Sequence, residues 1–230
     1  MAASATRGRA NPLALAVLTL LSERPMHPYE ISGTLRERHK EDSIKLNYGS
    51  LYSVVDSLHK RELIASRETV REGKRPERTV YEITPAGLAE MHDWLSDLLA
   101  NPVKEFAQFE AALSLMPTLP PEEVAHLLEA RLRSQLQRKR EHEAAAEIAR
   151  KHLPRLFMVE DEFRQALLDT EIAFTRNLLR ELKSGEFDGL RIWTRMHELR
   201  ESGATPEEFE AQLTTEFAEA VNWLNQPEEN

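Results

Sequence analysis

The sequence predicts a mainly α-helical protein in which a small N-terminal module with one β-hairpin is followed by a larger all-helical region. The 230 residues include only eight glycines and twelve prolines, which favours long helices. Apolar residues recur at helical spacing along most of the chain, and alternation at a period of two replaces this pattern only between residues 64 and 84. With 41% hydrophobic and 30% charged residues, the chain is polar but can still build a core.

The composition excludes several classes of protein. No cysteine is present, so disulfide frameworks, thiol catalysis and thiolate zinc sites are all excluded. An apolar run at residues 13–21 follows Arg7 and Arg9 and imitates a signal peptide, but the charged sequence Ser22-Glu23-Arg24-Pro25 stands where small residues should precede a cleavage site. The run is also about half as long as a membrane-spanning helix. We therefore expect a cytoplasmic protein with no membrane segment.

The charge of the chain is unevenly distributed. The formal net charge is −9, but residues 1–88 hold 14 Lys and Arg against 11 Asp and Glu, a net charge of +3. Residues 89–230 hold 16 and 28, a net charge of −12. A slightly basic N-terminal module is therefore attached to an acidic body.

Three helices are predicted in the N-terminal module. The first covers about residues 12–22, starts after Asn11-Pro12 and is apolar on most sides. The second runs from Pro28 to about Lys40. The third covers residues 47–60, and its apolar stripe consists of Leu51, Val54, Val55 and Leu58. The polar and aromatic residues that face elsewhere are Tyr48, Tyr52, Ser53, Asp56, His59 and Lys60.

A β-hairpin with a basic tip is predicted next. Residues 64–71 and 78–84 favour strands, and the turn residues Gly73-Lys74-Arg75-Pro76 lie between them. A further helix then starts at Thr84-Pro85 and runs to about Leu99. Its apolar stripe consists of Leu88, Met91, Leu95 and Leu98.

The rest of the chain is predicted to be helical, after a boundary near Asn101-Pro102. We expect helical segments at residues 105–116, 121–152, 155–183, 187–201 and 206–224. The long segment 121–152 carries one apolar stripe, Val124, Leu128, Leu132 and Leu136, which could pair with a second chain. Packing inside a bundle of the same chain is the alternative. We expect a domain at residues 10–100, a helical C-terminal dimerisation domain at residues 104–186, and extra helices at residues 187–230.

No motif for catalysis, metal binding or a cofactor is found. The sequence has no glycine-rich phosphate loop, no G-x-S-x-G elbow and no H-E-x-x-H pair. The run Glu141-His142-Glu143 is spaced so that its side chains diverge on a helix. We therefore expect no enzymatic activity, no metal site and no cofactor.

The order helix, helix, helix, hairpin, helix over residues 12–99 is the plan of a winged helix-turn-helix domain. In such a domain the third helix enters the major groove of duplex DNA, and the hairpin reaches flanking phosphates or the minor groove. The predicted DNA-binding residues are Asn47, Tyr48, Ser50, Tyr52, Ser53, Lys60, Lys74, Arg75 and Arg78. Tyr48 and Ser50 are assigned to bases or phosphates, and Tyr52 and Lys60 to phosphates. For each residue taken singly, covering the core or solubilising a turn is an alternative role.

These residues resemble the PadR family of bacterial transcriptional regulators. The resemblance covers about residues 10–100 and rests on Asn47-Tyr48-Gly49-Ser50-Leu51-Tyr52, Leu58, Leu63, Ile64, Gly73-Lys74-Arg75-Pro76, Tyr81-Glu82-Ile83-Thr84-Pro85-Ala86-Gly87 and His27-Pro28-Tyr29-Glu30-Ile31. Residues 104–186 are similar to the helical domain of the larger, AphA-like members, whose dimers form through long helices. Ser53 stands where many relatives have proline, and residues 187–230 extend beyond the usual domain.

The resemblance implies a dimer that binds a two-fold symmetric operator in double-stranded DNA and represses transcription. It also implies a small aromatic or hydrophobic effector, which we expect to bind between the module and the helical body and to release DNA. Aromatic residues beyond the core stripes are Trp94, Phe106, Phe109, Phe157 and Trp193. The alternative function is a protein-interaction adaptor whose winged helix packs against protein partners and does not bind DNA.

Overall fold

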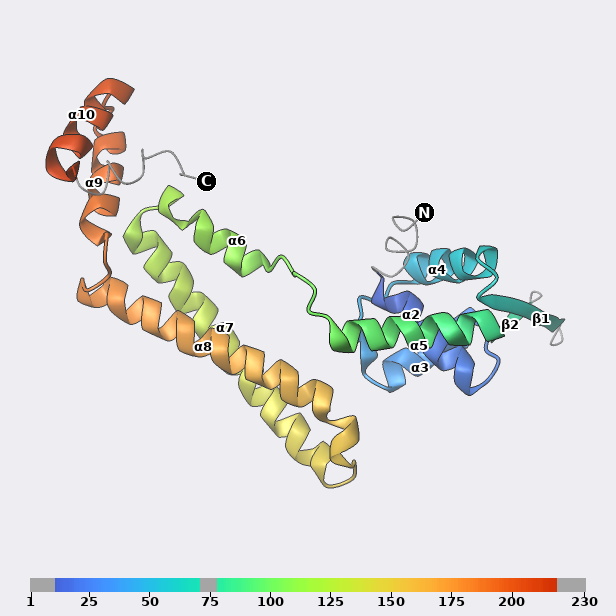
Figure 1. Ribbon diagram of the computed structural model, residues 1–230. Coiled ribbons are helices and arrows are strands. Elements are labelled where there is room, and N and C mark those ends of the chain that lie inside the picture. The colour runs from blue at the N-terminus through green and yellow to red at the C-terminus, as the bar shows by residue number, and fades with distance from the viewer. Residues whose placement is uncertain (1–10, 71–77, 219–230) are drawn as a thin grey trace. The chain divides into compact units, whose positions relative to one another are not determined.

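The computed structural model of the chain describes residues 11–70 and 78–218, with the backbone alone at residues 48, 68–70 and 78. The chain forms two compact units, Met1–Glu105 and Phe106–Asn230, which we call unit 1 and unit 2. Unit 1 combines helices with a two-stranded antiparallel sheet, and the described part of unit 2 is helical (Figure 1). The chain is therefore mainly α-helical, with a winged helix-turn-helix arrangement in unit 1, as predicted.

Unit 1 contains the helices and strands in the predicted order. They are α2 (Pro12–Glu23), α3 (Pro28–Glu37), the 3-10 turn η1 (Lys40–Asp42), α4 (Tyr48–Lys60), β1 (Ile64–Val70), β2 (Arg78–Ile83) and α5 (Pro85–Ala100). The second helix was predicted to reach Lys40, which is wrong: α3 ends at Glu37 because His39 has a left-handed backbone conformation with a φ of 54°.

The helices of unit 1 start at capped positions. The side chain of Asn11 accepts a hydrogen bond from the Leu13 N–H at 3.1 Å, and proline occupies the first turn of α2. At α3 the cap is a histidine: His27 Nδ1 accepts from the Tyr29 N–H at 3.0 Å, and Glu30 accepts from the His27 N–H at 2.8 Å. These bonds satisfy backbone donors that have no partner inside a helix.

One apolar core joins α2, α3, α4, β1 and α5. Its fully buried members include Leu13, Val17, Leu18, Ile31, Leu51, Leu58, Ile64 and Trp94. Burying a large apolar side chain stabilises the fold by about 1.5–3 kcal/mol, so this cluster holds the helices in a fixed arrangement.

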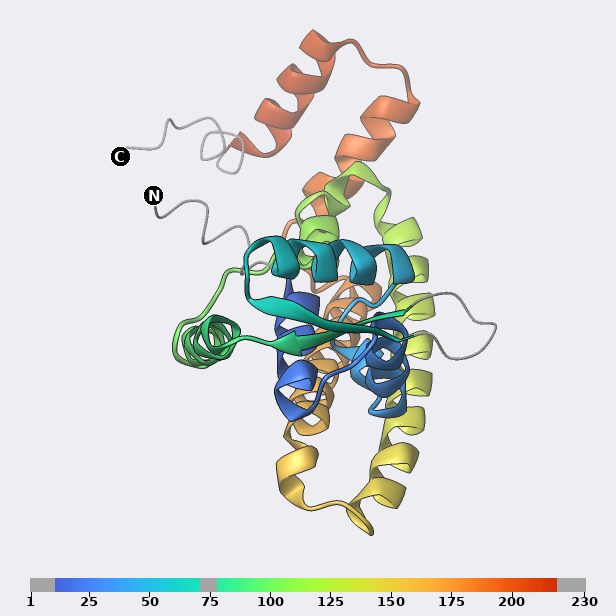
Figure 2. The same cartoon turned by 90° about the vertical axis from the view of Figure 1, so that its right-hand side faces the viewer.

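The hairpin is attached to the helices at its base. Ile64 pairs with Ile83 and Ser66 with Tyr81, and an irregularity follows between Ser66 and Glu68. Met26 exchanges two backbone hydrogen bonds of 3.0 Å with Tyr81, so the loop before α3 extends the sheet. Figure 2 shows the two strands beside α4. The contact fixes the base of the wing relative to the helices.

Helix α5 packs on unit 1 mainly through residues outside its leucine stripe. Trp94 and Gly87 are buried, whereas Leu88, Leu95 and Leu98 keep 42–46% of their surface exposed. Gly87 is required because a Cβ at this position would overlap the carbonyl oxygen of Leu63. Thr84 Oγ1 accepts from the Gly87 N–H at 3.0 Å and lies 2.8 Å from the Glu62 carbonyl oxygen.

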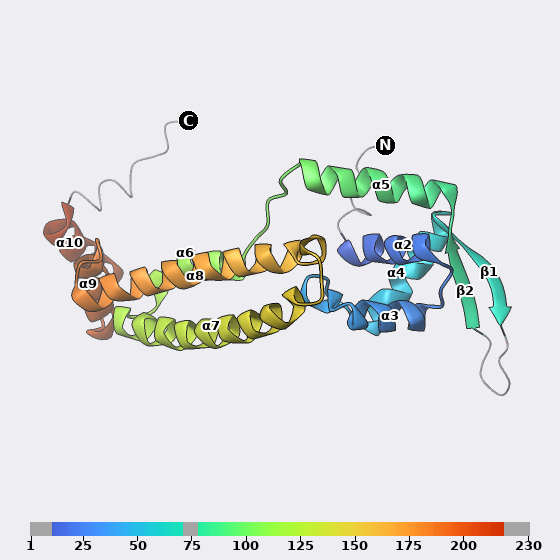
Figure 3. The same ribbon diagram turned by 90° about the horizontal axis from the view of Figure 1, so that it is seen from below.

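Unit 2 is built around two long helices. Its elements are α6 (Gln108–Ser114), η2 (Met116–Thr118), α7 (Pro121–Arg150), η3 (Arg155–Phe157), α8 (Val159–Ser184), α9 (Leu190–Glu201) and α10 (Pro206–Glu216). Helices α7 and α8 run side by side in opposite directions (Figure 3). Helix α9 closes one end, where the Trp193 indole N–H donates to the Leu119 carbonyl at 2.8 Å. The predicted segments 105–116 and 155–183 are each divided into a 3-10 turn and a shorter helix, next to Pro117 and Pro154.

In the described part of the chain, no helix combines the length and the apolar character that crossing a bilayer requires.

We expect Gly87→Ala to destabilise unit 1 by roughly 2 kcal/mol or more, because α5 must move away from the Leu63 carbonyl to accommodate a methyl group. Gly33→Ala in α3 is the matched control. No atom lies within 4 Å of a Cβ at Gly33, so that substitution should stabilise the helix by about 0.5–1 kcal/mol. Urea unfolding measures both free energies. Equal effects of the two substitutions would contradict the close approach.

Candidate nucleic-acid interface

Helix α4 has one buried side and one open side. Leu51, Val54, Val55 and Leu58 are all less than 10% exposed and face the core of unit 1. At about 100° per residue, the positions opposite this stripe form a second line along the helix, which we call the outer line. The outer line consists of Gly49, Ser53, Asp56 and Lys60, and all four are exposed. The burial of one stripe therefore turns the outer line away from the protein.

The start of α4 is shaped by its cap. The side chain of Asn47 accepts a hydrogen bond from the Ser50 N–H at 2.6 Å, and Ser53 Oγ donates to the Gly49 carbonyl at 2.9 Å. A Cβ at Gly49 would approach only the Asn47 side chain, at 3.8 Å. The packing of the chain therefore does not require glycine here, although glycine weakens a helix. Because Gly49 has no side chain, the backbone of α4 is not covered at this position of the outer line.

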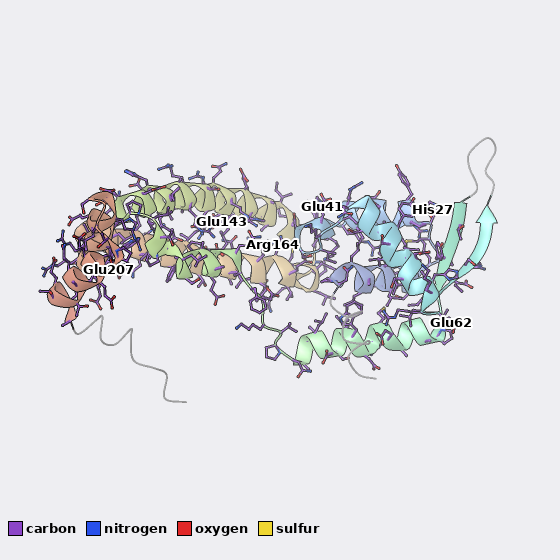
Figure 4. All side chains as sticks on the ribbon, turned by 90° about the horizontal axis from the view of Figure 1, so that it is seen from above. His27, Glu41, Glu62, Glu143, Arg164 and Glu207 are labelled. Atoms are coloured by element: carbon purple, nitrogen blue, oxygen red, sulfur yellow. The ribbon has the colours of Figure 1, made fainter. Side chains whose placement is uncertain are left out.

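An aromatic flank runs beside the outer line. Tyr52 is 50% exposed, and the His59 and Tyr81 rings stand edge to face with centroids 5.7 Å apart. A hollow of about 570 Å³ lies between α4, strand β2 and the start of α3, and Tyr52, Asp56 and His27 are among its lining residues. Figure 4 labels His27 at the start of α3, beside the hairpin. The hollow gives the open side of α4 a concave border.

The charges on this surface are mostly paired. Lys60 Nζ lies 2.7 Å from Asp56 Oδ2, and this hydrogen bond lowers the pKa of the Asp56 carboxyl and raises the pKa of the Lys60 ammonium. Five arginines of unit 1 also have carboxylate partners, in the pairs Arg24–Glu30, Arg36–Glu41, Arg38–Glu23, Arg61–Glu90 and Arg67–Glu82. Asp56 and Lys60 both carry charge at neutral pH, so they neutralise each other. Among the residues of unit 1 whose side chains are described, 9 Lys and Arg stand against 12 Asp and Glu, a net charge of −3.

Five of the predicted DNA-binding residues lie on or at the start of α4 with their side chains described: Asn47, Ser50, Tyr52, Ser53 and Lys60. Tyr48 is the first residue of α4 and Arg78 the first of β2, and only their backbones are described. Lys74 and Arg75 lie outside the described residues. Sequence reasoning did not assign Gly49 and Asp56 to the site. The spacing of four between Asp56 and Lys60 was the signal that could have identified their pairing.

The stripe predicted for dimerisation is partly used inside unit 2. Val124 and Leu128 are 5% exposed and pack in a core with Leu178, Leu182 and Trp193. Leu132 packs against the same core, and Leu136 is half-buried. The intramolecular alternative therefore accounts for the burial of Val124 and Leu128.

Within residues 11–70 and 78–218, no group of three or more His, Asp or Glu side chains could hold a metal ion. The open side of α4 can instead supply hydroxyls, an aromatic ring, a carboxylate and an ammonium group. These are groups suited to hydrogen bonding with base edges and phosphates.

Comparison with known proteins places this surface in context. Residues 17–93 match the Transcriptional regulator PadR-like family. A crystal structure of Bacillus subtilis PadR in complex with operator DNA matches with 18% identity and a TM-score of 0.59, covering 75% of this chain and 99% of that chain. The same protein in complex with p-coumaric acid matches with 17% identity and a TM-score of 0.60, covering 74% and 98%.

The Vibrio cholerae virulence activator AphA matches with 18% identity and a TM-score of 0.57, covering 75% of this chain and 98% of that chain. A comparison with curated protein sequences found no match. At these identities the structural likeness establishes the fold, and the family match is confined to residues 17–93, within α2 to α5. Residues 17–93 are therefore a PadR-like domain, of the kind found in transcriptional regulators.

Proposed function

We propose that the chain is a cytoplasmic, homodimeric repressor that binds a two-fold symmetric operator in double-stranded DNA and has no catalytic activity. The observation that carries this proposal is the open side of α4, where the outer line and Tyr52 are exposed beside the hairpin in a PadR-like domain. The likeness to PadR bound to operator DNA supports it. The protein of similar fold from Vibrio cholerae is an activator, so reporter assays at the operator decide whether this chain represses or activates transcription.

In this proposal α4 enters the major groove and the wing follows the phosphate backbone. Tyr48 and Ser50 approach bases or phosphates at the start of the helix, and Tyr52 reaches a phosphate from its flank. Because the described cations of unit 1 are largely paired, the proposal assigns most of the phosphate affinity to Lys74, Arg75 and Arg78 at the wing.

We expect Arg75→Ala to weaken binding to all sequences about equally, because an arginine that binds a phosphate carries charge but no base information. For a random-sequence 30-bp duplex, the logarithm of the association constant falls linearly with the logarithm of salt concentration. The slope of this line should become less negative by about 0.9 for each phosphate contact that the variant loses. Arg133→Ala on α7, which removes an exposed arginine of unit 2, is the matched control. Fluorescence anisotropy across a salt titration measures both slopes.

The same titration distinguishes the adaptor function. An adaptor whose winged helix packs on proteins would show no salt-dependent affinity for the duplex at any concentration tested. That result would contradict the proposed function.

For the dimer, we propose that α8 supplies the contact between two copies. Val159, Phe163, Leu167 and Phe174 recur at spacings of four, four and seven and remain 50–65% exposed. They lie on a different side of α8 from Leu168, Ile172, Thr175 and Leu179, which are buried within unit 2, and the buried Leu178 lies at the border between the two sides. A narrow apolar seam of this spacing is typical of helices that pack against each other. Since Val124 and Leu128 are buried within one chain, exposed side chains are better candidates for the contact.

The double substitution Phe163→Glu and Leu167→Glu should give a monomer of 26.4 kDa in sedimentation equilibrium, because two charges would be buried against the partner copy. Leu127→Glu on α7, which is 52% exposed, should leave the dimer intact. A double variant that still sediments as a dimer would exclude this seam.

We also propose that a small aromatic effector releases DNA, by analogy with the PadR structure that contains p-coumaric acid. Trp94 and Trp193 are buried in the two cores, so ordinary packing explains them, whereas Phe106 and Phe157 are exposed. An effector must bind the DNA-free arrangement more tightly, since equal affinity for both shifts no equilibrium. We expect a phenolic compound such as p-coumaric acid to lower the affinity of the protein for duplex DNA. Fluorescence anisotropy of the duplex measures this affinity. If such compounds bind the protein without lowering its affinity for duplex DNA, the protein has a ligand site but the ligand does not control DNA binding.

A further inference from the structure

The outer line of α4 carries a carboxylate, which is unusual for a surface that approaches phosphates. The side chains of Asp56 and Lys60 are 67% and 76% exposed and are held together at 2.7 Å. Lysine alone could serve a phosphate, but an aspartate beside it would offset the gain. The pair therefore adds little general attraction to DNA.

The pair presents a hydrogen-bond acceptor and a donor side by side. Lys60 Nζ bonds to one carboxylate oxygen of Asp56, and the second oxygen lies on a helix face that is open to solvent. The ammonium group keeps two further N–H donors. In the major groove, cytosine offers an N4 amino donor, and guanine offers the acceptors O6 and N7. Cytosine N4 and guanine O6 are themselves joined by a hydrogen bond of about 2.9 Å, which is close to the spacing within the ion pair.

We propose that Asp56 and Lys60 together read one G·C base pair in each half-site. Asp56 accepts a hydrogen bond from cytosine N4, and Lys60 donates to guanine O6 or N7. This inference rests on the proposed function, because it requires α4 to enter the major groove. It assigns Lys60 to a base, where the sequence pattern assigned it to a phosphate.

The neighbours of the pair on the outer line make a close approach possible. The preceding positions hold Gly49 and Ser53, and neither adds a long side chain between the helix backbone and the groove. Pairs at the same i, i+4 spacing also occur at α7: Lys139, which is 32% exposed and lies closer to Asp169, pairs with Glu143, and Glu147 pairs with Lys151, the residue after the helix. Those pairs can act as ordinary helix-stabilising contacts. Asp56 and Lys60 differ because they stand opposite the core stripe of the helix assigned to DNA.

The test is a selection from a duplex library that contains a random 30-bp region, carried out with the full-length protein. The variants are Asp56→Asn, Asp56→Ala and Lys60→Ala. Asp93→Asn on α5 makes the same carboxylate-to-amide change at another exposed position of unit 1 and is the matched control. Thermal unfolding checks that each variant folds, which we expect because both side chains are exposed.

The wild-type protein and Asp93→Asn should enrich G·C at one position of each half-site. Asp56→Asn should shift that position toward A·T by roughly tenfold, because an asparagine side chain pairs with adenine N6 and N7. Asp56→Ala should remove the preference there and leave the other positions unchanged. Lys60→Ala should weaken the same preference.

If Asp56→Asn and Asp56→Ala raise the affinity for every sequence equally and keep each base preference, Asp56 only repels phosphates and the inference is overturned. A wild-type protein that enriches no sequence would instead overturn the proposed function, and the inference with it. The two failures are distinguished by the wild-type selection alone.

Discussion

The burial of one stripe of α4 is the constraint on which the interface depends. Leu51, Val54, Val55 and Leu58 pack against α2 and α3, and this packing fixes the rotation of α4 about its axis. A turn of one residue position would move the Tyr52 ring, or the polar residues Ser50 and Ser57, toward the core and expose leucines. Each buried side chain contributes about 1.5–3 kcal/mol, so such a rotation is strongly disfavoured. The direction of the outer line is therefore a consequence of core packing.

The charge distribution of unit 1 suggests that affinity for DNA and discrimination between DNA sequences depend on different residues. The arginines of the described part of unit 1 largely have carboxylate partners, and on α4 the only lysine is paired with Asp56. Sequence-independent affinity for DNA comes from unpaired cations, whereas base contacts decide between sequences. Under the proposed function, an α4 with little net charge, beside a wing that carries Lys74 and Arg75 in its sequence, suits a protein that discriminates between operators. The net charge of −12 over residues 89–230 opposes coating of DNA by the body of the protein.

Much of the fold was predictable because its helix starts are encoded locally. The helices that begin at Pro12, Pro28, Pro85, Pro121 and Pro206 all start at the predicted residue, since proline favours the first turn. The ends were less predictable: the left-handed conformation of His39 shortens α3, and α10 ends at Glu216, where Phe217 departs from helical angles.

The docking of α5 shows the limit of periodicity. Its leucine stripe and the pair Gly87 and Trp94 both have helical spacing, and only the close approach to Leu63 reveals that the second set is buried. At the site, the helical period predicted the polar face of α4. It did not identify Asn47 as a cap, and the spacing of four between Asp56 and Lys60 permits their pairing without fixing it, because side-chain partners depend on rotamers that a sequence pattern does not specify.

The most direct test of the central claim is the accessibility of the outer line in the presence of DNA. The chain has no cysteine, so Ser53→Cys introduces a single thiol at the middle of the outer line. Ser184→Cys, at the exposed end of α8, is the control. We predict that a saturating random-sequence duplex slows the reaction of N-ethylmaleimide with Cys introduced at position 53 and leaves the reaction at position 184 unchanged. Equal reaction rates at position 53 with and without bound duplex would contradict the entry of α4 into the groove.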